Sequence, residues 1–233
     1  MFSAEGRLLM LVGACAVLWT LESVLPLYRY RGGRLRHAMP NIALTVILLL
    51  MNLAFSFVAA SASRFVVLEL PPWMHVLLGI AALDFCTYAA HVLLHKLPLG
   101  WRFHRVHHSD EHVDVTTAFR QHPGETIWRI VWQLPAIVLF GIPLWVVVVY
   151  LTISSLNAQL EHANIALPER LDRALRLLFV TPNMHKVHHS RLQRETDSNY
   201  ANIFSVWDRL FGTYTRRVDF ATLSYGLDDL DVR

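Results

Sequence analysis

Charged residues are scarce in this chain of 233 residues: they make up 17% of it, whereas hydrophobic residues make up 54%. An ordinary soluble domain carries about 25% charged residues, so this shortage argues against a soluble protein. The mean hydropathy of +0.36 points the same way. The net charge of +3 does not indicate binding to nucleic acid, because the arginines are spread over loops that flank apolar segments. We therefore predict an integral membrane protein.

Cysteine is nearly absent as well. Cys15 and Cys86 both lie inside apolar segments and no C-x-x-C occurs, which argues against a disulfide framework, a zinc finger and an iron-sulfur cluster. The chain also lacks a Pro- or Ser-rich linker, so we expect a single domain over residues 1–233. Because G-x-G-x-x-G, G-x-x-x-x-G-K-[ST] and G-x-S-x-G are all missing, the sequence signals neither a nucleotide site nor a nucleophile elbow.

Long apolar runs predict an all-α fold with about four transmembrane segments. Residues 8–21 form an uncharged run, which we interpret as a short first span rather than a signal peptide because only Arg7 precedes it as a basic residue. Residues 41–63 give about 34 Å of helix, enough to cross a bilayer. The N-terminal spans thus fall within residues 8–63, and a third helix begins at Pro71 and Pro72.

The fourth apolar region, from Ile127 to about Leu160, is broken by Pro135, Gly141 and Pro143. We predict a hairpin of two shorter helices that turns near Gly141, because a single crossing would leave the later histidines on the wrong side of the membrane. An amphipathic helix is expected from Pro168 to Phe179. Four arginines in the loop of residues 29–37 favour the cytoplasmic side for that loop and for the histidines.

Histidine is the residue type around which the chain is organised. The segment WRFHRVHHS, residues 101–109, returns as MHKVHHS at residues 184–190. In a helix the histidines of each copy stand at i, i+3 and i+4 and share one face. His91 and His95 form a third cluster with spacing i, i+4. The eight histidines are His91, His95, His104, His107, His108, His185, His188 and His189. Imidazole is a common ligand of transition metals, so this pattern predicts a site with more than one metal ion.

Asp84 lies seven residues before His91, on the same stripe of the third helix. A carboxylate inside a membrane helix usually faces a functional interior. We expect Asp84 to orient an imidazole by accepting its second N–H. The alternative is a hydrogen bond that serves only helix packing.

The motifs HVLLH, HRVHH, FRQHP, HAN and TPNMHKVHH, followed by NYANIFSVWDRLFGTY, resemble the fatty acid hydroxylase/sterol desaturase superfamily of membrane diiron enzymes. The resemblance covers residues 84–214. It implies a bundle of transmembrane helices below a cytosolic helical cap, in which the histidines gather around two metal ions. By this resemblance the eight histidines become metal ligands.

The resemblance adds two further positions. His162 stands where related hydroxylases place another ligand, and Ala158 one turn earlier limits that helix to one. His122 matches an HP-x-E element, as a metal ligand or as a group that orients one. His37, His75 and His112 are expected to lie outside the metal site.

A diiron site of this kind implies an O2-dependent lipid oxidoreductase that hydroxylates or desaturates a sterol-like or fatty-acyl lipid at an unactivated C–H bond. The cofactors would be two iron ions, with zinc as a substitute during purification. The partners would be a lipid substrate, O2, membrane lipids and an external electron donor (a cytochrome, ferredoxin or reductase), in a bacterial inner membrane or the endoplasmic reticulum. Arg102, Arg105, Lys186 and Arg191 could receive that donor or lipid phosphates.

Two other classes of protein stay open. A dizinc lipid hydrolase would need a general base such as Glu125 or Glu161. A metal or haem carrier is disfavoured because the histidines are too many and lie at helix ends. The sequence does not distinguish hydroxylation from desaturation, and it does not identify the lipid.

Overall fold

The computed structural model describes residues 3–29, 32–62, 71–217, 219–220 and 222–227. Over these residues the fold is all-α, with two isolated β-bridges and no extended strand. The long helices are α1 (Ala4–Val24), α2 (Arg34–Ala62), α3 (Pro72–Lys96), α5 (Pro123–Leu139) and α6 (Leu144–His162). The short helices are α4 (Pro98–His108), the 3-10 helix η1 (Val115–Phe119), α7 (Glu169–Leu175), α8 (Pro182–His188), α9 (Gln193–Thr196) and α10 (Val206–Leu210).

Four helices are long and apolar enough to cross a membrane, namely α1, α2, α3 and α6, which confirms the predicted membrane fold. The sides of α1 and α2 that face away from the bundle are apolar and exposed; Leu50, for example, is 64% exposed. Because such faces are stable only against lipid, these two helices form the outer wall of the bundle. The expectation of one domain over residues 1–233 stays a prediction.

The first two spans differ from their predicted bounds. The first span continues past Glu22, which interrupts the uncharged run of residues 8–21, and ends at Val24. The buried carboxylate of Glu22 is tolerated because it pairs with Arg34 and accepts hydrogen bonds from the backbone N–H groups of Val115 and Asn164, at 2.7 Å in each case. The second span begins seven residues earlier than predicted, at Arg34; residue 63, its predicted end, and residues 30–31 of the arginine loop lie outside the described residues.

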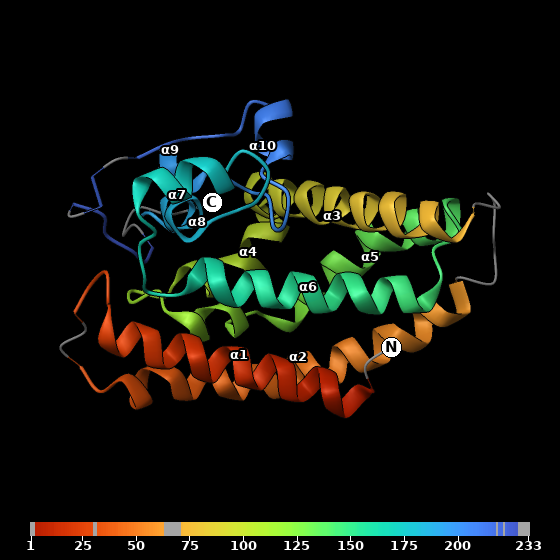
Figure 1. The fold of residues 1–233 in the computed structure, drawn as a ribbon, viewed down its shortest axis with the longest axis horizontal. Coiled ribbons are helices and arrows are strands. Elements are labelled where there is room, and N and C mark those ends of the chain that lie inside the picture. The colour runs from red at the N-terminus through yellow and green to blue at the C-terminus, as the bar shows by residue number, and fades with distance from the viewer. Residues whose placement is uncertain (1–2, 30–31, 63–70, 218, 221, 228–233) are drawn as a thin grey trace.

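The predicted hairpin is present. Helix α5 leads away from the histidines, the chain turns at residues 140–143, and α6 leads back (Figure 1). Gly141 has φ of 56°, a conformation that glycine adopts without the steric cost of a side chain. The two helices are longer than the half-helices we expected, since α6 alone could cross a membrane.

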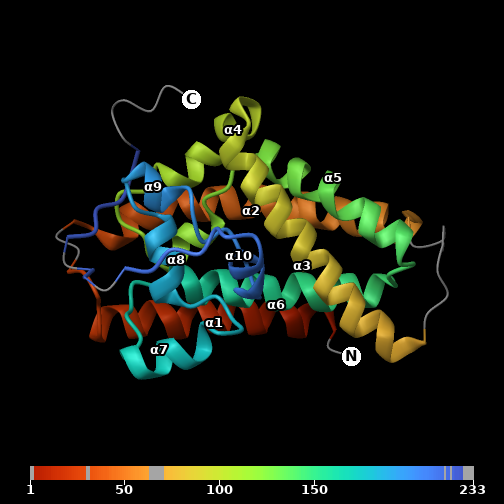
Figure 2. The same ribbon diagram turned by 90° about the horizontal axis from the view of Figure 1, so that it is seen from above.

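The membrane helices pack around a common apolar core. Helix α3 packs on α5 and α6, α2 packs on α5, and α1 packs on α6. The core contains Phe55, Leu83, Ile137, Val147 and Tyr150, one or more from each of α2, α3, α5 and α6. Gly79 permits the close approach of α3 to α6, because a Cβ atom there would lie 3.1 Å from a methyl group of Val146. Figure 2 shows α3 crossing over α6 at an angle.

The remaining elements gather at one end of the bundle (Figures 1 and 2). We call this the cap: α4, η1, α7, α8, α9, α10 and the loops between them. The helix predicted from Pro168 to Phe179 is shorter than expected and ends at Leu175. The last residues of the predicted helix are not helical, because Phe179 forms a β-bridge with Phe204. The neighbouring Val180 donates its N–H to the carbonyl oxygen of Ile203.

Candidate metal centre

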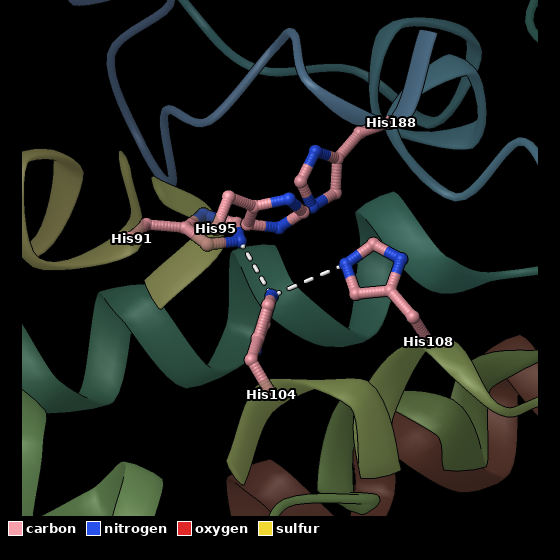
Figure 3. A group of neighbouring side chains, drawn as sticks. All are labelled: His91, His95, His104, His108 and His188. Carbon is pink, nitrogen blue, oxygen red and sulfur yellow. Dashed lines mark hydrogen bonds between the residues drawn. The ribbon is translucent and has the colours of Figure 1, made fainter. Parts of the chain in front are cut away.

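Nine buried histidines meet where the cap joins the bundle, and they form two groups. In the first group the five potential ligand nitrogens lie within 4.8 Å of one another. Its members come from α3, α4 and α8: His91, His95, His104, His108 and His188. Figure 3 shows these imidazoles pointing toward one another, with His104 between His91 and His108. The Nε2 atom of His104 lies 2.9 Å from that of His91 and 3.2 Å from that of His108.

The second group contains His107, His162, His185 and His189. The Nε2 atom of His162 is central, at 3.1 Å from that of His107 and 3.0 Å from those of His185 and His189. The two groups adjoin, because the rings of His108 and His189 stack with centroids 4.7 Å apart. The structure thus brings together all nine histidines that the sequence and the resemblance singled out.

The two repeats exchange roles between the groups. In the first copy, His104 and His108 at i and i+4 join the five-histidine group, whereas His107 at i+3 joins the other. The second copy reverses this: His185 and His189 join the four-histidine group, and His188 joins the five-histidine group. Neighbouring side chains in each helix therefore serve different groups.

The second ring nitrogen of many of these histidines is held by an oxygen acceptor. Backbone carbonyl oxygens lie 2.6–3.2 Å from the Nδ1 atoms of four of them: His91, His107, His162 and His188. A carbonyl oxygen only accepts, so each of these Nδ1 atoms carries the proton, and each neutral ring has a bare lone pair on Nε2.

Lone pairs converging in this way repel one another unless a cation lies among them. A single proton on the Nε2 atom of His162 could bridge to only one of its three neighbours. Two nitrogens bound about 2.1 Å from a common ion, at about 90° to each other, would lie about 3.0 Å apart, as observed. The donor set therefore fits a metal ion in each group.

Burial keeps the histidines of the cap neutral. Loss of hydration lowers the pKa of His104, His107 and His108 well below the usual value, and the neighbouring imidazoles lower it further. The same two causes act on the pKa of His185, His188 and His189, where burial is again the larger. Neutral imidazole is the form that binds metal, so these rings need lose no proton before they bind.

Two carboxylates orient members of the five-histidine group. Oε2 of the fully buried Glu125 lies 3.0 Å from Nδ1 of His104, and its Oε1 accepts hydrogen bonds from Nε and Nη2 of Arg129. Asp197 lies 3.3 Å from Nδ1 of His95 and also pairs with Lys96. Sequence reasoning considered Glu125 only as a general base, and it missed Asp197, which follows no periodic pattern.

The role predicted for Asp84 is wrong. Its buried carboxylate accepts hydrogen bonds from the backbone N–H groups of Ile203 and Phe204 and from Nε1 of Trp207, at 2.9–3.1 Å, rather than from an imidazole. The stripe shared with His91 is real, but Asp84 lies two turns deeper and meets the cap loop there. Asp84 joins α3 to the cap.

His122 also lies apart from both groups. Its Nδ1 accepts the N–H of Gly124 and so caps α5, while its ring stacks on Phe103 with centroids 5.1 Å apart. A metal-ligand role for His122 is therefore not supported. His37, His75 and His112 lie outside the two groups, as expected.

A cavity of about 120 Å³ between α2, α3, α5 and α6 leads to the histidines. It reaches three members of the four-histidine group, His107, His162 and His185, but only His91 of the other. The carboxylate of Glu161 also lines it and lies 3.8 Å from Nε2 of His185. The four-histidine group is thus the one that faces the space between the membrane helices.

Lys186 cannot meet a partner protein, which corrects one expectation. It is fully buried in α8, and its ammonium group donates to the carbonyl oxygen of Ala163. Burial lowers the pKa of Lys186 to about 7. Arg102 and Arg105 are exposed and remain available at the surface of α4.

These features define a helical membrane protein with a two-part histidine centre below a cap. Comparison of the sequence with known protein families identifies the family, because the fatty acid hydroxylase family matches residues 76–213. The chain belongs to the fatty acid hydroxylase family. No solved structure matches it.

Characterised relatives are lipid-modifying enzymes by name. The chain is 33% identical over 144 residues to the ornithine lipid hydroxylase OlsE of Rhizobium tropici. The matched region covers 62% of this chain and 43% of that protein. It is 30% identical over 208 residues to the alkylglycerol monooxygenase of Homo sapiens, covering 85% and 44% of the two chains. The Danio rerio alkylglycerol monooxygenase is 33% identical over 165 residues, covering 69% and 35%. The chain thus spans less than half the length of these relatives.

Proposed function

We propose that this protein is an O2-dependent diiron hydroxylase of membrane lipids. One observation carries the proposal: nine imidazoles converge in two adjoining groups that could each hold a cation, beside a cavity between membrane helices. Two of the relatives are named as an ornithine lipid hydroxylase and an alkylglycerol monooxygenase, and these names agree with the proposed activity. Iron is preferred because a hydroxylation needs a metal that exchanges electrons, which zinc does not do.

The overall reaction balances with one O2 and two electrons. One oxygen atom is inserted into a C–H bond to give an alcohol, and the other leaves as water after taking up two protons and the two electrons. The iron ions, when bound, would supply the activation of O2 and the oxidation of the C–H bond. An external redox protein, which could be a cytochrome, ferredoxin or reductase, would supply the electrons.

The residues of the chain would hold the metal ions, orient the imidazole rings and shield the centre from water. Five imidazoles would hold one ion, and four the other, which would leave more of its coordination sphere open toward the cavity. Glu125 would fix the ring of His104, and Asp197 that of His95. The cap would exclude bulk water, since the nine histidines are all buried.

We further propose that the cap faces the cytoplasm, in a bacterial inner membrane or the endoplasmic reticulum. The arginines that flank the cap end of the bundle favour this side: Arg29, Arg34, Arg36, Arg102 and Arg105. A redox protein carrying acidic residues could then approach the exposed arginines of α4.

The test is reconstitution with ferrous iron without air, followed by addition of ¹⁸O2, a reductant and a membrane lipid extract. We expect about two irons per chain and lipid products that carry one ¹⁸O atom from O2. A matched sample loaded with zinc should give no such product. Products that take their oxygen from water, formed without reductant, would instead establish a dizinc hydrolase.

A haem carrier is the third outcome. Its sign would be a Soret band in the purified protein in place of non-haem iron. The geometry gives no support to it, because the clustered Nε2 atoms lie 2.9–3.2 Å apart. Axial histidines of a haem lie on opposite sides of a porphyrin and so must stay well separated.

A further inference from the structure

Several polar side chains line the cavity that leads to the histidines, although it is bounded by membrane helices. They include Asn52 from α2, Thr87 from α3, Arg129 and Gln133 from α5, and Ser154 and Ser155 from α6. Polar groups at membrane depth are usually satisfied by other parts of the protein, or else they serve a ligand.

Some of them are satisfied within the protein. Nε2 of Gln133 donates to the hydroxyl of Thr87 at 2.9 Å, and that hydroxyl also bonds to the hydroxyl of Tyr150 at 2.6 Å. Ser154 accepts a hydrogen bond from the side chain of Asn202. These contacts hold one end of the Gln133 amide in a fixed position.

Other groups at the cavity have no hydrogen-bond partner among the residues that the structure describes. They are the second end of the Gln133 amide, the Asn52 amide, the Ser155 hydroxyl and the Nη1 atom of Arg129. The set includes both donors and acceptors and comes from three different helices. A bare alkyl chain would leave all four of them unpaired, which makes it a poor occupant of this cavity.

The side-chain charges at the cavity favour an uncharged occupant. The guanidinium of Arg129 is neutralised by Glu125 at 2.9 Å, and the carboxylate of Glu161 lines the same space. A phosphate or carboxylate would find no unpaired cationic side chain among the described residues that line the cavity, so the bound metal ions alone would attract it. A hydroxyl or amide group both donates and accepts hydrogen bonds and fits this set.

We propose that this cavity binds the uncharged polar part of the lipid, a hydroxyl or amide group, through Gln133, Asn52 and Ser155. The inference rests on the proposed function. Because the same cavity is lined by His107, His162 and His185, the polar group lies close to the metal centre. Oxygen is then inserted at a carbon within a few bonds of the polar group, and the tail points away between the helices.

A binding experiment tests this without turnover. The iron-loaded protein is held under nitrogen and titrated with octyl glycerol ether, 1-octanol and octane, which share one chain length. We expect octyl glycerol ether to bind about tenfold or more tightly than octane, because a site built for hydrogen bonds rejects an analogue without them. Equal binding of octane would overturn the proposal.

Two variants locate the site. Gln133→Leu and Ser155→Ala should each weaken binding of octyl glycerol ether several-fold while iron content and octane binding stay unchanged. Thr152→Val is the matched control, because this hydroxyl on α6 bonds to the carbonyl oxygen of Val148 and does not line the cavity. Unchanged binding in both Gln133→Leu and Ser155→Ala would also overturn the proposal.

Product analysis separates this inference from the proposed function. Under ¹⁸O2, tandem mass spectrometry should place the new hydroxyl within about three carbons of the polar group. A hydroxyl in mid-chain or at the terminal methyl would overturn the binding mode and leave the hydroxylase intact. Selective binding without any ¹⁸O product would overturn the hydroxylase and leave the polar cavity in place.

Discussion

The Nδ1 atom of His104 lies 3.0 Å from the Oε2 atom of Glu125, and neither side chain reaches solvent. Glu125 stands in the first turn of α5, whereas His104 lies in α4, so the contact joins the hairpin to the cap. Arg129 completes the arrangement by pairing with the other carboxylate oxygen. The ring of His104 is thereby held in place by a buried ion pair.

Replacement of Glu125 by glutamine tests this arrangement. Glu125→Gln keeps the shape of the side chain but removes the charge that orients His104 and compensates Arg129. We expect affinity for ferrous iron to fall by about 10–100-fold, the usual effect of losing such a partner. Anaerobic titration with ferrous iron measures it, with Glu111→Gln as a control outside the centre. Unchanged affinity would show that the contact has no part in holding metal.

The division into five and four histidines predicts unequal losses of metal. His162→Ala leaves three imidazoles in its group, whereas His95→Ala leaves four in the other. We expect His162→Ala to retain about one iron per chain, and His95→Ala to retain more, because a site with four ligands still binds firmly. Iron and protein are measured after desalting, with His75→Ala as the control. Equal loss of both ions from the two variants would contradict separate sites.

Asp84→Asn distinguishes packing from metal orientation. The carboxylate accepts three hydrogen bonds from Ile203, Phe204 and Trp207, and an amide nitrogen in its place would face N–H donors. We expect a loss of about 1–3 kcal/mol in the free energy of unfolding, because buried donors are left unsatisfied. Trp207→Phe removes only one of these bonds and should have a smaller effect. A large fall in iron affinity at unchanged stability would restore the orienting role that we first assigned to Asp84.

The ion pairs of Glu169 in the cap make a pH-dependent contribution to the stability of the fold. Its hydrogen bond with Arg176, followed by the charges of Arg176, Arg216 and Arg173, lowers the pKa of Glu169. A carboxylate with a lowered folded-state pKa stabilises the fold above its unfolded value of about 4.3, and this contribution is lost as the pH falls through the folded value. The Tm difference between the wild type and Glu169→Gln should therefore shrink as the pH is lowered from neutral to below 4. Glu5→Gln, at the opposite end of the bundle, is the control. A difference that stays constant over this range would contradict the ion pairing.

The sequence predicted which histidines belong to the centre, but it did not predict how they divide into the groups of five and four. Residues i, i+3 and i+4 share a helix face, but at about 100° per residue the i+3 and i+4 side chains diverge to opposite sides of the first. His107 and His108 therefore point to different groups, and no periodicity tells which group is which. The hairpin was predictable, because Pro143 and Gly141 break a long apolar run and the histidines must lie on one side.

Tertiary contacts decided the features that the sequence could not give. Asp84 and Glu125 are both buried carboxylates near histidines, yet only Glu125 reaches an imidazole, because the loop at Ile203 occupies the space beside Asp84. The early end of α7 has a similar cause, since pairing of Val180 with Ile203 outweighs a local helical pattern. Such outcomes depend on segments far apart in the chain, which local propensity does not register.

The exchange of roles between the two histidine repeats bears on how the protein is made. Each group takes ligands from both α4 and α8, which are separated by 73 residues or more, so neither group is complete until the later repeat has left the ribosome and docked. A chain interrupted before His188 would therefore lack a complete set of histidines in both groups.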